Sequence, residues 1–304
     1  MKKAVIVSNL LLCLFFAVNP AYSADRPTVF VSILPQKFFV QQISGDHFRV
    51  EVMVQPGASP HTYEPKPSQM RKLAEARAYF TIGVALESVW LDKIRTINPD
   101  MKVIHTEANI TRMKMAGDHR HEDEHVEDHE KPGGEHDEQD GEEGLDPHIW
   151  LSPELVAIQV KTITDSLVEL DPEQAQLYQG NYKRFSARVD DLDKRLHTIL
   201  EGKAGTKFMV FHPSWGYFAR SYGLTQIAVE IEGKSPKPAY LKKLIDLAAR
   251  QQITVIFAQP QFSKKSAEMI AREIGGEVVF IDPLAEDWFA NMTYVADTLS
   301  SALR

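Results

Sequence analysis

Residues 145–153, Leu-Asp-Pro-His-Ile-Trp-Leu-Ser-Pro, separate a highly charged stretch from the helical middle of the chain. His148 lies between an X-Pro turn and an apolar residue, with the carboxylate of Asp146 two positions away. This setting predicts an oriented ligand rather than a solvated side chain. A lone histidine is more often a satisfied core or surface residue. A functional role for His148 therefore requires partners elsewhere in the chain.

Two helices are predicted directly after this stretch. The first runs from Pro153 to Glu169, with Ser152 as its N-cap and proline at its first position. Pro172 opens the second, which has Asp171 as cap and apolar residues at helical spacing as far as about Glu201. At 1.5 Å per residue it would span roughly 45 Å. We therefore expect residues 171–203 to be a long helix that connects two domains.

Strands and helices alternate on both sides of this helical middle. The alternation predicts parallel sheets with helices on both faces, so the expected fold class is α/β. The N-terminal lobe is expected to comprise residues 24–170 and the C-terminal lobe residues 204–304. Strands are expected at 28–34, 48–54, 78–82, 101–105, 207–211, 224–231, 253–258 and 277–281, and further helices at 35–44, 67–77, 86–96, 213–222, 238–250, 263–274 and from about 289.

The first 23 residues resemble a cleaved export signal. Lys2 and Lys3 precede an apolar run that is too short for a convincing membrane span, and Ala21-Tyr22-Ser23 provides small residues for cleavage. Cys13, the single cysteine, lies in this segment without the preceding small residue of a lipid-attachment site. We expect a mature periplasmic chain without cysteine, in which any metal is held by His, Asp or Glu.

Most of the net charge of −8 is concentrated in residues 118–143, which contain 13 acidic and 2 basic residues. The remaining chain is nearly neutral and has no basic stripe, so nucleic-acid binding is not expected. The segment contains a single branched apolar residue, Val126, and cannot offset its ordering entropy by burial, which predicts a mobile loop. It is either a solvating linker or a weak metal-collecting arm, and its histidines favour the second interpretation. These are His119, His121, His125, His129 and His136.

Three further positions are candidate partners for His148. His61 follows the strand at 48–54, His212 follows the strand at 207–211, and Asp282 follows the strand at 277–281. Open α/β sheets place ligands at the carboxyl ends of their strands, and three imidazoles with one carboxylate suit Zn²⁺. Each member also has a structural alternative.

His61 is also compatible with a polar turn, Asp282 with a helix cap or an Asx turn, and His212 with packing on Trp215. His105 ends a predicted strand as well. Spacing alone does not decide between His105 and His148.

Five motifs together indicate a family. They are Pro56–Pro65 (Pro-Gly-Ala-Ser-Pro-His-Thr-Tyr-Glu-Pro), Asp146–Pro153, Phe211–Tyr217, Glu232–Pro236 and Ile281–Leu284. With these motifs the chain resembles the cluster-9 solute-binding proteins, the metal-binding periplasmic components of ABC-type zinc and manganese importers, over essentially its whole mature length. The resemblance implies two Rossmann-like lobes joined by a rigid helix, and small rearrangements on metal release. By position, His61, His148, His212 and Asp282 match the metal ligands of the family.

The resemblance implies a periplasmic protein that captures Zn²⁺ as transported cargo between its lobes and delivers it to a membrane permease. A monomer is expected, with a periplasmic zinc chaperone as a further partner, and no enzymatic activity. Histidine at position 212 and the acidic histidine-rich loop resemble the zinc-specific members, whereas manganese-specific members tend to carry glutamate at that position.

Two alternatives remain from the sequence. One is a manganese-binding or adhesin-type relative. The other is a secreted zinc hydrolase with Glu64 as general base, although no His-Glu-x-x-His motif is present. Because imidazole must be neutral to bind a metal, affinity is expected to fall as the pH drops through about 6.5.

Overall fold

The structure is a computed structural model, and it describes residues 26–115, 144–230 and 236–303. The predicted export signal, the acidic loop 118–143 and most of the Glu232–Pro236 motif lie outside the described residues. Within the described ranges, no helix combines the length and apolar character needed to cross a membrane.

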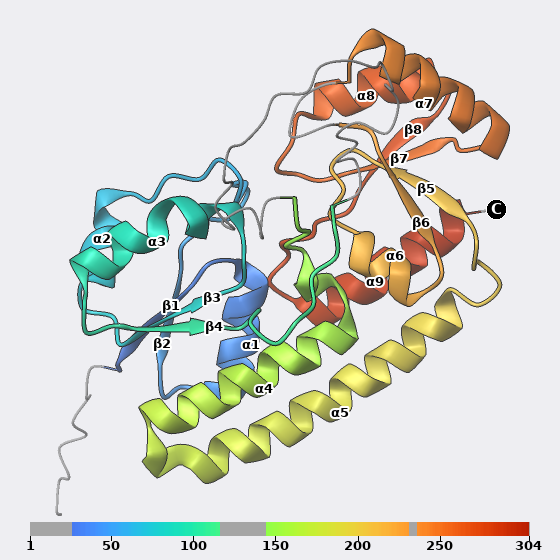
Figure 1. Cartoon of the computed structure of the whole chain (residues 1–304). Coiled ribbons are helices and arrows are strands. Elements are labelled where there is room, and N and C mark those ends of the chain that lie inside the picture. The colour runs from blue at the N-terminus through green and yellow to red at the C-terminus, as the bar shows by residue number, and fades with distance from the viewer. Residues whose placement is uncertain (1–25, 116–143, 231–235, 304) are drawn as a thin grey trace, which may run out of the picture.

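The N-terminal sheet has four strands, all paired in parallel, in the order β2-β1-β3-β4. Helix α1 covers one face, and α2 and α3 cover the other (Figure 1). The alternation of strand and helix in the sequence therefore forms the predicted α/β arrangement. The elements are β1 (Thr28–Val31), α1 (Leu34–Ser44), β2 (Arg49–Val52), α2 (Pro67–Leu73), β3 (Ala78–Thr81), α3 (Ala85–Ile97) and β4 (Lys102–His105).

The C-terminal sheet repeats this topology, with parallel strands in the order β6-β5-β7-β8. Helices α6 and α9 lie on one side of it, and α7 and α8 on the other (Figure 1). The predicted class, α/β with two parallel sheets, is confirmed. The elements are β5 (Lys207–Val210), α6 (Gly216–Ser221), β6 (Thr225–Ala228), α7 (Pro238–Gln251), β7 (Val255–Ala258), α8 (Lys264–Glu273), β8 (Glu277–Phe280) and α9 (Trp288–Ala302).

The two helices between the sheets are α4 (Pro153–Leu170) and α5 (Ala175–Ile199). The predicted helix does begin at Pro172, but its first turn, Pro172–Gln174, is a 3-10 helix that continues directly into α5. With 25 residues, α5 spans roughly 37 Å.

Ser152 and Asp171 occupy the predicted N-cap positions, but neither side chain makes a capping hydrogen bond. Ser152 Oγ lies 3.3 Å from Ser221 Oγ, and the Asp171 carboxylate accepts a hydrogen bond from the hydroxyl of Tyr178 at 2.8 Å. The first contact is tertiary, whereas the second is local, because Tyr178 lies seven positions further along the same helical segment. The boundaries suggested for the lobes and the connecting segment remain proposals.

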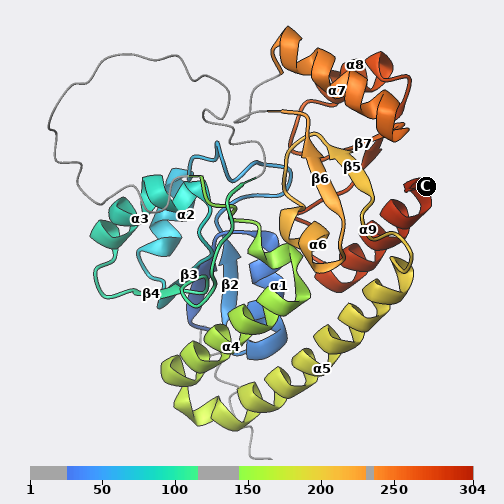
Figure 2. The same ribbon diagram turned by 45° about the vertical axis from the view of Figure 1, so that its right-hand side comes forward.

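Helix α5 joins the two halves through a cluster of phenylalanines. Its Phe185 lies 5.9 Å from Phe39 and 6.4 Å from Phe38 of α1, and 5.2 Å from Phe289 of α9, measured between ring centroids. Both views show α5 running from the side of α1 towards the C-terminal lobe (Figures 1 and 2). Apolar packing thus holds the two sheets on a common helical base.

Candidate metal centre

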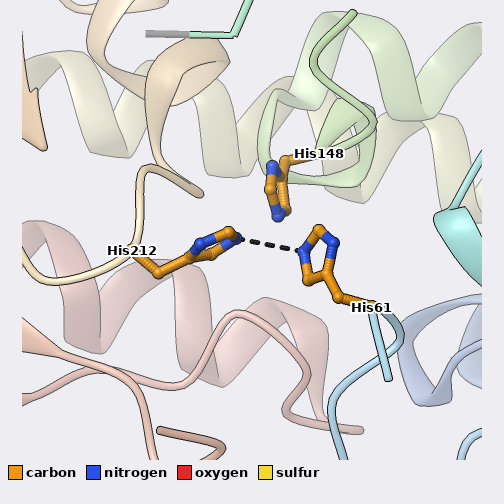
Figure 3. Close-up of side chains that lie close together, drawn as sticks. All are labelled: His61, His148 and His212. Carbon is orange, nitrogen blue, oxygen red and sulfur yellow. Dashed lines mark hydrogen bonds between the residues drawn. The ribbon is translucent and has the colours of Figure 1, made fainter. Parts of the chain in front are cut away.

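Three histidines converge between the two sheets. His61, His148 and His212 each offer a ring nitrogen, and these atoms all lie within 4.8 Å of one another. The Nε2 atoms of His61 and His212 are 3.2 Å apart (Figure 3). Among the described residues, this is the one cluster of three or more metal-binding side chains.

The histidines reach this point from three separate segments. His61 lies in the loop after β2, His148 immediately precedes the 3-10 turn Ile149–Leu151, and His212 follows the end of β5. Two indole groups hold the segment that carries His148. Trp150 Nε1 donates to the carbonyl of Pro283, and Trp288 Nε1 donates to the carbonyl of Trp150, both at 2.7 Å. The segment that carries His148 is therefore hydrogen-bonded to the part of the chain that follows β8.

A side chain at the end of β7 fixes the backbone of His212. Gln259 is fully buried, and its Oε1 accepts from the N–H of His212 at 3.2 Å while its Nε2 donates to the His212 carbonyl at 2.7 Å. This two-point contact between neighbouring strand ends restricts the direction of the His212 side chain. The crevice at the carboxyl ends of parallel strands is where open α/β sheets bind ligands.

Aromatic rings form the walls of a small cavity around the histidines. Phe262 stacks on His212 with ring centroids 4.7 Å apart, and Trp150 lies 5.2 Å from His148. His212 therefore stacks on Phe262, not on Trp215 as one alternative had it. The cavity has a volume of about 20 Å³. It can hold one particle of the size of a water molecule, which needs about 10–15 Å³.

Two of the rings favour the neutral form. His61 is exposed as a whole residue, but desolvation of its ring lowers its pKa to about 3, and the neighbouring His212 and His148 reinforce this effect by repulsion between imidazolium charges. Burial also lowers the pKa of His212, although the hydrogen bond to Glu230 opposes the shift. Neutral imidazoles at neutral pH can bind a metal ion without first losing a proton.

Each of two histidines contacts a buried carboxylate through its Nδ1 atom. His148 Nδ1 lies 2.7 Å from Asp146 Oδ1, as the sequence suggested, and His212 Nδ1 lies 2.5 Å from Glu230 Oε1. The sequence reasoning missed Glu230. Its signal was a lone acidic residue in the run Gln-Ile-Ala-Val-Glu-Ile, residues 226–231.

The structure places the other candidates outside the cluster. Asp282 Oδ1 accepts from Gln261 Nε2 at 2.7 Å and from the N–H of Leu284 at 2.9 Å. His105 is bonded to Glu107 at 2.9 Å on the edge strand β4, and Glu64 is exposed. The five loop histidines lie outside the described residues.

The spacing within the cluster suits tetrahedral coordination. With Zn–N bonds of about 2.0–2.1 Å, two nitrogens of a tetrahedral zinc site lie roughly 3.3–3.4 Å apart. The His61–His212 separation of 3.2 Å is close to this value. Two α/β lobes with three imidazoles between them define a two-lobed metal-binding protein.

Comparison with known proteins identifies the family. The family model described as zinc-uptake complex component A, periplasmic, ZnuA, matches residues 29–302, and the chain belongs to this family. The chain is 27% identical to the high-affinity zinc uptake system protein ZnuA of Yersinia pestis, over 93% of this chain and 89% of that protein.

Two further comparisons concern a structure and a longer relative. A crystal structure of a ZnuA deletion mutant with zinc bound matches with a TM-score of 0.80 and 42% identity, over 91% of this chain and 98% of that one. The zinc-binding protein AdcA of Streptococcus pyogenes is 26% identical over 98% of this chain. The chain spans 61% of the length of AdcA.

Proposed function

We propose that this chain is a periplasmic zinc-binding protein, which captures Zn²⁺ between its two lobes and delivers it to the permease of an ABC-type importer. His61, His148 and His212 are the proposed ligands. The observation that carries the proposal is the convergence of their ring nitrogens within 4.8 Å, from segments far apart in the sequence. The zinc-related family to which the chain belongs supports the same ion. Zinc is cargo here, and the protein acts as a monomer without enzymatic activity.

The proposed fourth ligand is Asp282, with a water molecule or Glu64 as the alternative. In the structure, Gln261 and the backbone N–H of Leu284 both donate to Asp282 Oδ1. A bond to the ion through Oδ2 would therefore not require the loss of these hydrogen bonds. Asp282→Ala should therefore weaken zinc binding less than loss of a histidine, because water can occupy the fourth position.

Zinc titration of two histidine variants tests the proposal directly. His148→Ala removes one ligand and should weaken zinc affinity at least tenfold, about 1.4 kcal/mol. His105→Ala is the matched control, because His105 is a histidine of the same lobe, at the end of β4, that is hydrogen-bonded to Glu107 outside the cluster. Unchanged affinity in His148→Ala, together with lost affinity in His105→Ala, would refute the assignment.

The alternatives make different demands on the site. Manganese prefers oxygen ligands, whereas this cluster offers three nitrogens, and a zinc-against-manganese competition separates the two ions. A zinc hydrolase needs a general base beside an open coordination position. Glu64, the candidate base, is exposed and is not among the clustered side chains of the described chain.

We also propose that the acidic loop 118–143 collects zinc weakly through His119, His121, His125, His129 and His136. The chain leaves at Met115 and returns at Gly144, where the N–H of Met115 donates to the Gly144 carbonyl at 2.8 Å. Because the ends of the segment are already bonded to each other, its removal should leave the fold intact. Deletion should retain one tight site, lower the zinc stoichiometry and slow capture at low salt. Loss of the tight site would place a ligand in the loop, and full stoichiometry with unchanged capture would reduce the loop to a linker.

A permease and a periplasmic zinc chaperone are the proposed partners. The family description places its members in a periplasmic zinc-uptake complex, which supports a role as the soluble donor to a membrane component. Metal analysis of protein purified from the periplasm would test both the location and the cargo.

A further inference from the structure

Two of the three proposed ligands are held by carboxylates that are removed from solvent. Asp146 is 0% exposed and Glu230 is 2% exposed. One oxygen of each carboxylate contacts Nδ1 of a histidine, Asp146 with His148 and Glu230 with His212. The second oxygens, Asp146 Oδ2 and Glu230 Oε2, are buried and have no hydrogen-bond partner within the described part of the chain.

This arrangement has an electrostatic consequence. Burial of a carboxylate is costly unless a charge or several hydrogen bonds compensate for it, and the imidazole N–H supplies one bond. Two such groups on adjacent histidines place two negative charges around the cavity. A divalent cation in that cavity would offset both charges.

The geometry also determines which ring nitrogen faces the ion. An Nδ1–H that donates to a carboxylate leaves the lone pair on Nε2. The Nε2 atom of His212 is the one that approaches His61. The His61 ring differs from the other two. Within the described structure its hydrogen-bond partner is His212, and no carboxylate orients the His61 ring.

We infer that Glu230 is a positioning residue for His212, matched by Asp146 for His148, and that both increase zinc affinity by fixing the tautomer with the proton on Nδ1, which leaves Nε2 free to bind, and by adding negative charge. This inference rests on the proposed zinc function and extends it to two residues that do not touch the ion. Loss of such a partner typically weakens metal binding about 10- to 100-fold.

Two substitutions at position 230 separate charge from hydrogen bonding. Glu230→Gln keeps an acceptor for the Nδ1–H but removes the charge, and should weaken zinc binding about tenfold. Glu230→Leu removes both, and should weaken it about 100-fold. Glu87→Gln is the matched control. Glu87 is a buried acidic side chain, 6% exposed, that accepts from the backbone of Ile82 and Gly83 instead of contacting a histidine. Burial raises the pKa of Glu87 to about 8, so Glu87→Gln controls for the exchange of a buried acid for an amide and not for the loss of a charge.

The experiment combines zinc competition with a chelator and ¹⁵N NMR of the histidine side chains in metal-free protein. We expect wild-type His212 to carry its proton on Nδ1, and Glu230→Leu to show a mixture of tautomers with weaker zinc binding. If Glu230→Leu does not fold, Glu230→Gln and its zinc affinity decide. Unchanged affinity in the folded position-230 variants, or an equal loss in Glu87→Gln, would overturn the inference. Failure of the wild-type protein to bind zinc would instead refute the proposed function, and the tautomer measurement would still report on Glu230.

Discussion

The two lobes have the same strand order but differ in how their cores connect to the rest of the molecule. In the N-terminal lobe, successive residues of β1, Val29, Phe30 and Val31, belong to one apolar cluster that continues into α4, α5 and α9. In the C-terminal lobe, alternate residues of β5 face different clusters. Phe208 and Val210 join the large one, whereas Met209 packs with α7 and α8.

The smaller cluster consists of ten buried residues from the outer face of the second sheet and from α7 and α8. Because successive side chains of a strand point to opposite faces, the same β5 divides the lobe into an inner and an outer layer. The difference predicts that two lobes of equal topology unfold with unequal cooperativity. The inner layer is part of the shared core, and the outer layer depends on its own packing.

The largest loss of stability should come from a substitution in the core that the two lobes share. Phe185→Ala removes the ring that contacts both α1 and α9, and should lower the free energy of unfolding by about 3–5 kcal/mol. Leu177→Ala on the same helix is the control. Leu177 is 39% exposed, and its loss should change stability far less. Urea denaturation measures both, and similar losses would contradict a shared core centred on Phe185.

A substitution in the outer layer of the C-terminal lobe should have a more local effect on stability. Ile270→Ala in α8 removes a buried side chain of the smaller cluster, at a cost of about 2–5 kcal/mol to that layer. Amide hydrogen exchange should accelerate in α7 and α8 while α4 and α5 remain protected. Equal acceleration throughout the chain would show that the two layers unfold as one unit.

A third test concerns the contact between the lobes at Gly216. A Cβ added there would lie 2.8 Å from Asp146 Oδ2 and 2.5 Å from Met113 Cε. Tyr217 also donates to the Asp146 carbonyl at 2.9 Å. Gly216→Ala should therefore displace Asp146 and lower stability by about 1–3 kcal/mol, with weaker zinc binding.

The control for this test is Gly180→Ala in α5. A Cβ at Gly180 would meet its nearest atom, Arg184 Nη1, at 3.8 Å, an ordinary contact. The substitution should raise stability by up to about 1 kcal/mol because alanine favours the helix, and should leave zinc affinity unchanged. Thermal unfolding and zinc titration of both variants measure the difference. Equal zinc affinities would mean that Asp146 tolerates the displacement.

The smallest effect concerns pH. The sequence predicted a loss of zinc affinity through about pH 6.5, the pKa of free imidazole. In the folded protein, the pKa of His61 is lowered to about 3 and that of His212 is also lowered. Protons therefore compete less with zinc for these two rings near pH 6.5 than they would for free imidazole. The fall in affinity should move to lower pH.

The same pKa shifts also make the stability of the folded protein depend on pH. Unfolded histidines take up protons below about pH 6.5, whereas folded His61 does not until about pH 3. Stability of the metal-free protein should therefore be retained above about pH 6.5 and should decrease as the pH falls below it. NMR titration of the metal-free protein should show His61 still neutral at pH 5. A His61 midpoint near 6.5 would contradict the lowered pKa and show that the exposed side of the residue keeps its ring solvated.

The sequence alone determined the order of the elements and the fold class, because apolar periodicity and Pro or Gly breaks are local properties of the chain. It also indicated His61, His148 and His212, through strand ends and family motifs. Some local details were wrong. Ser152 and Asp171 occupy N-cap positions, but their side chains contact Ser221 and Tyr178 instead of the first N–H groups of their helices.

Only the tertiary structure decided which distant side chains meet. Glu230 contacts His212, 18 residues away in the sequence, and Gly216 leaves space for Asp146, 70 residues away. Neither pairing has a periodicity that the sequence could reveal. Glu230 meets His212 because β6 pairs beside β5 in the C-terminal sheet, whereas Gly216 meets Asp146 because the two lobes pack against each other. The division of β5 between two clusters also depends on tertiary packing. Alternation marks two faces, but the helices that cover each face determine which core it joins.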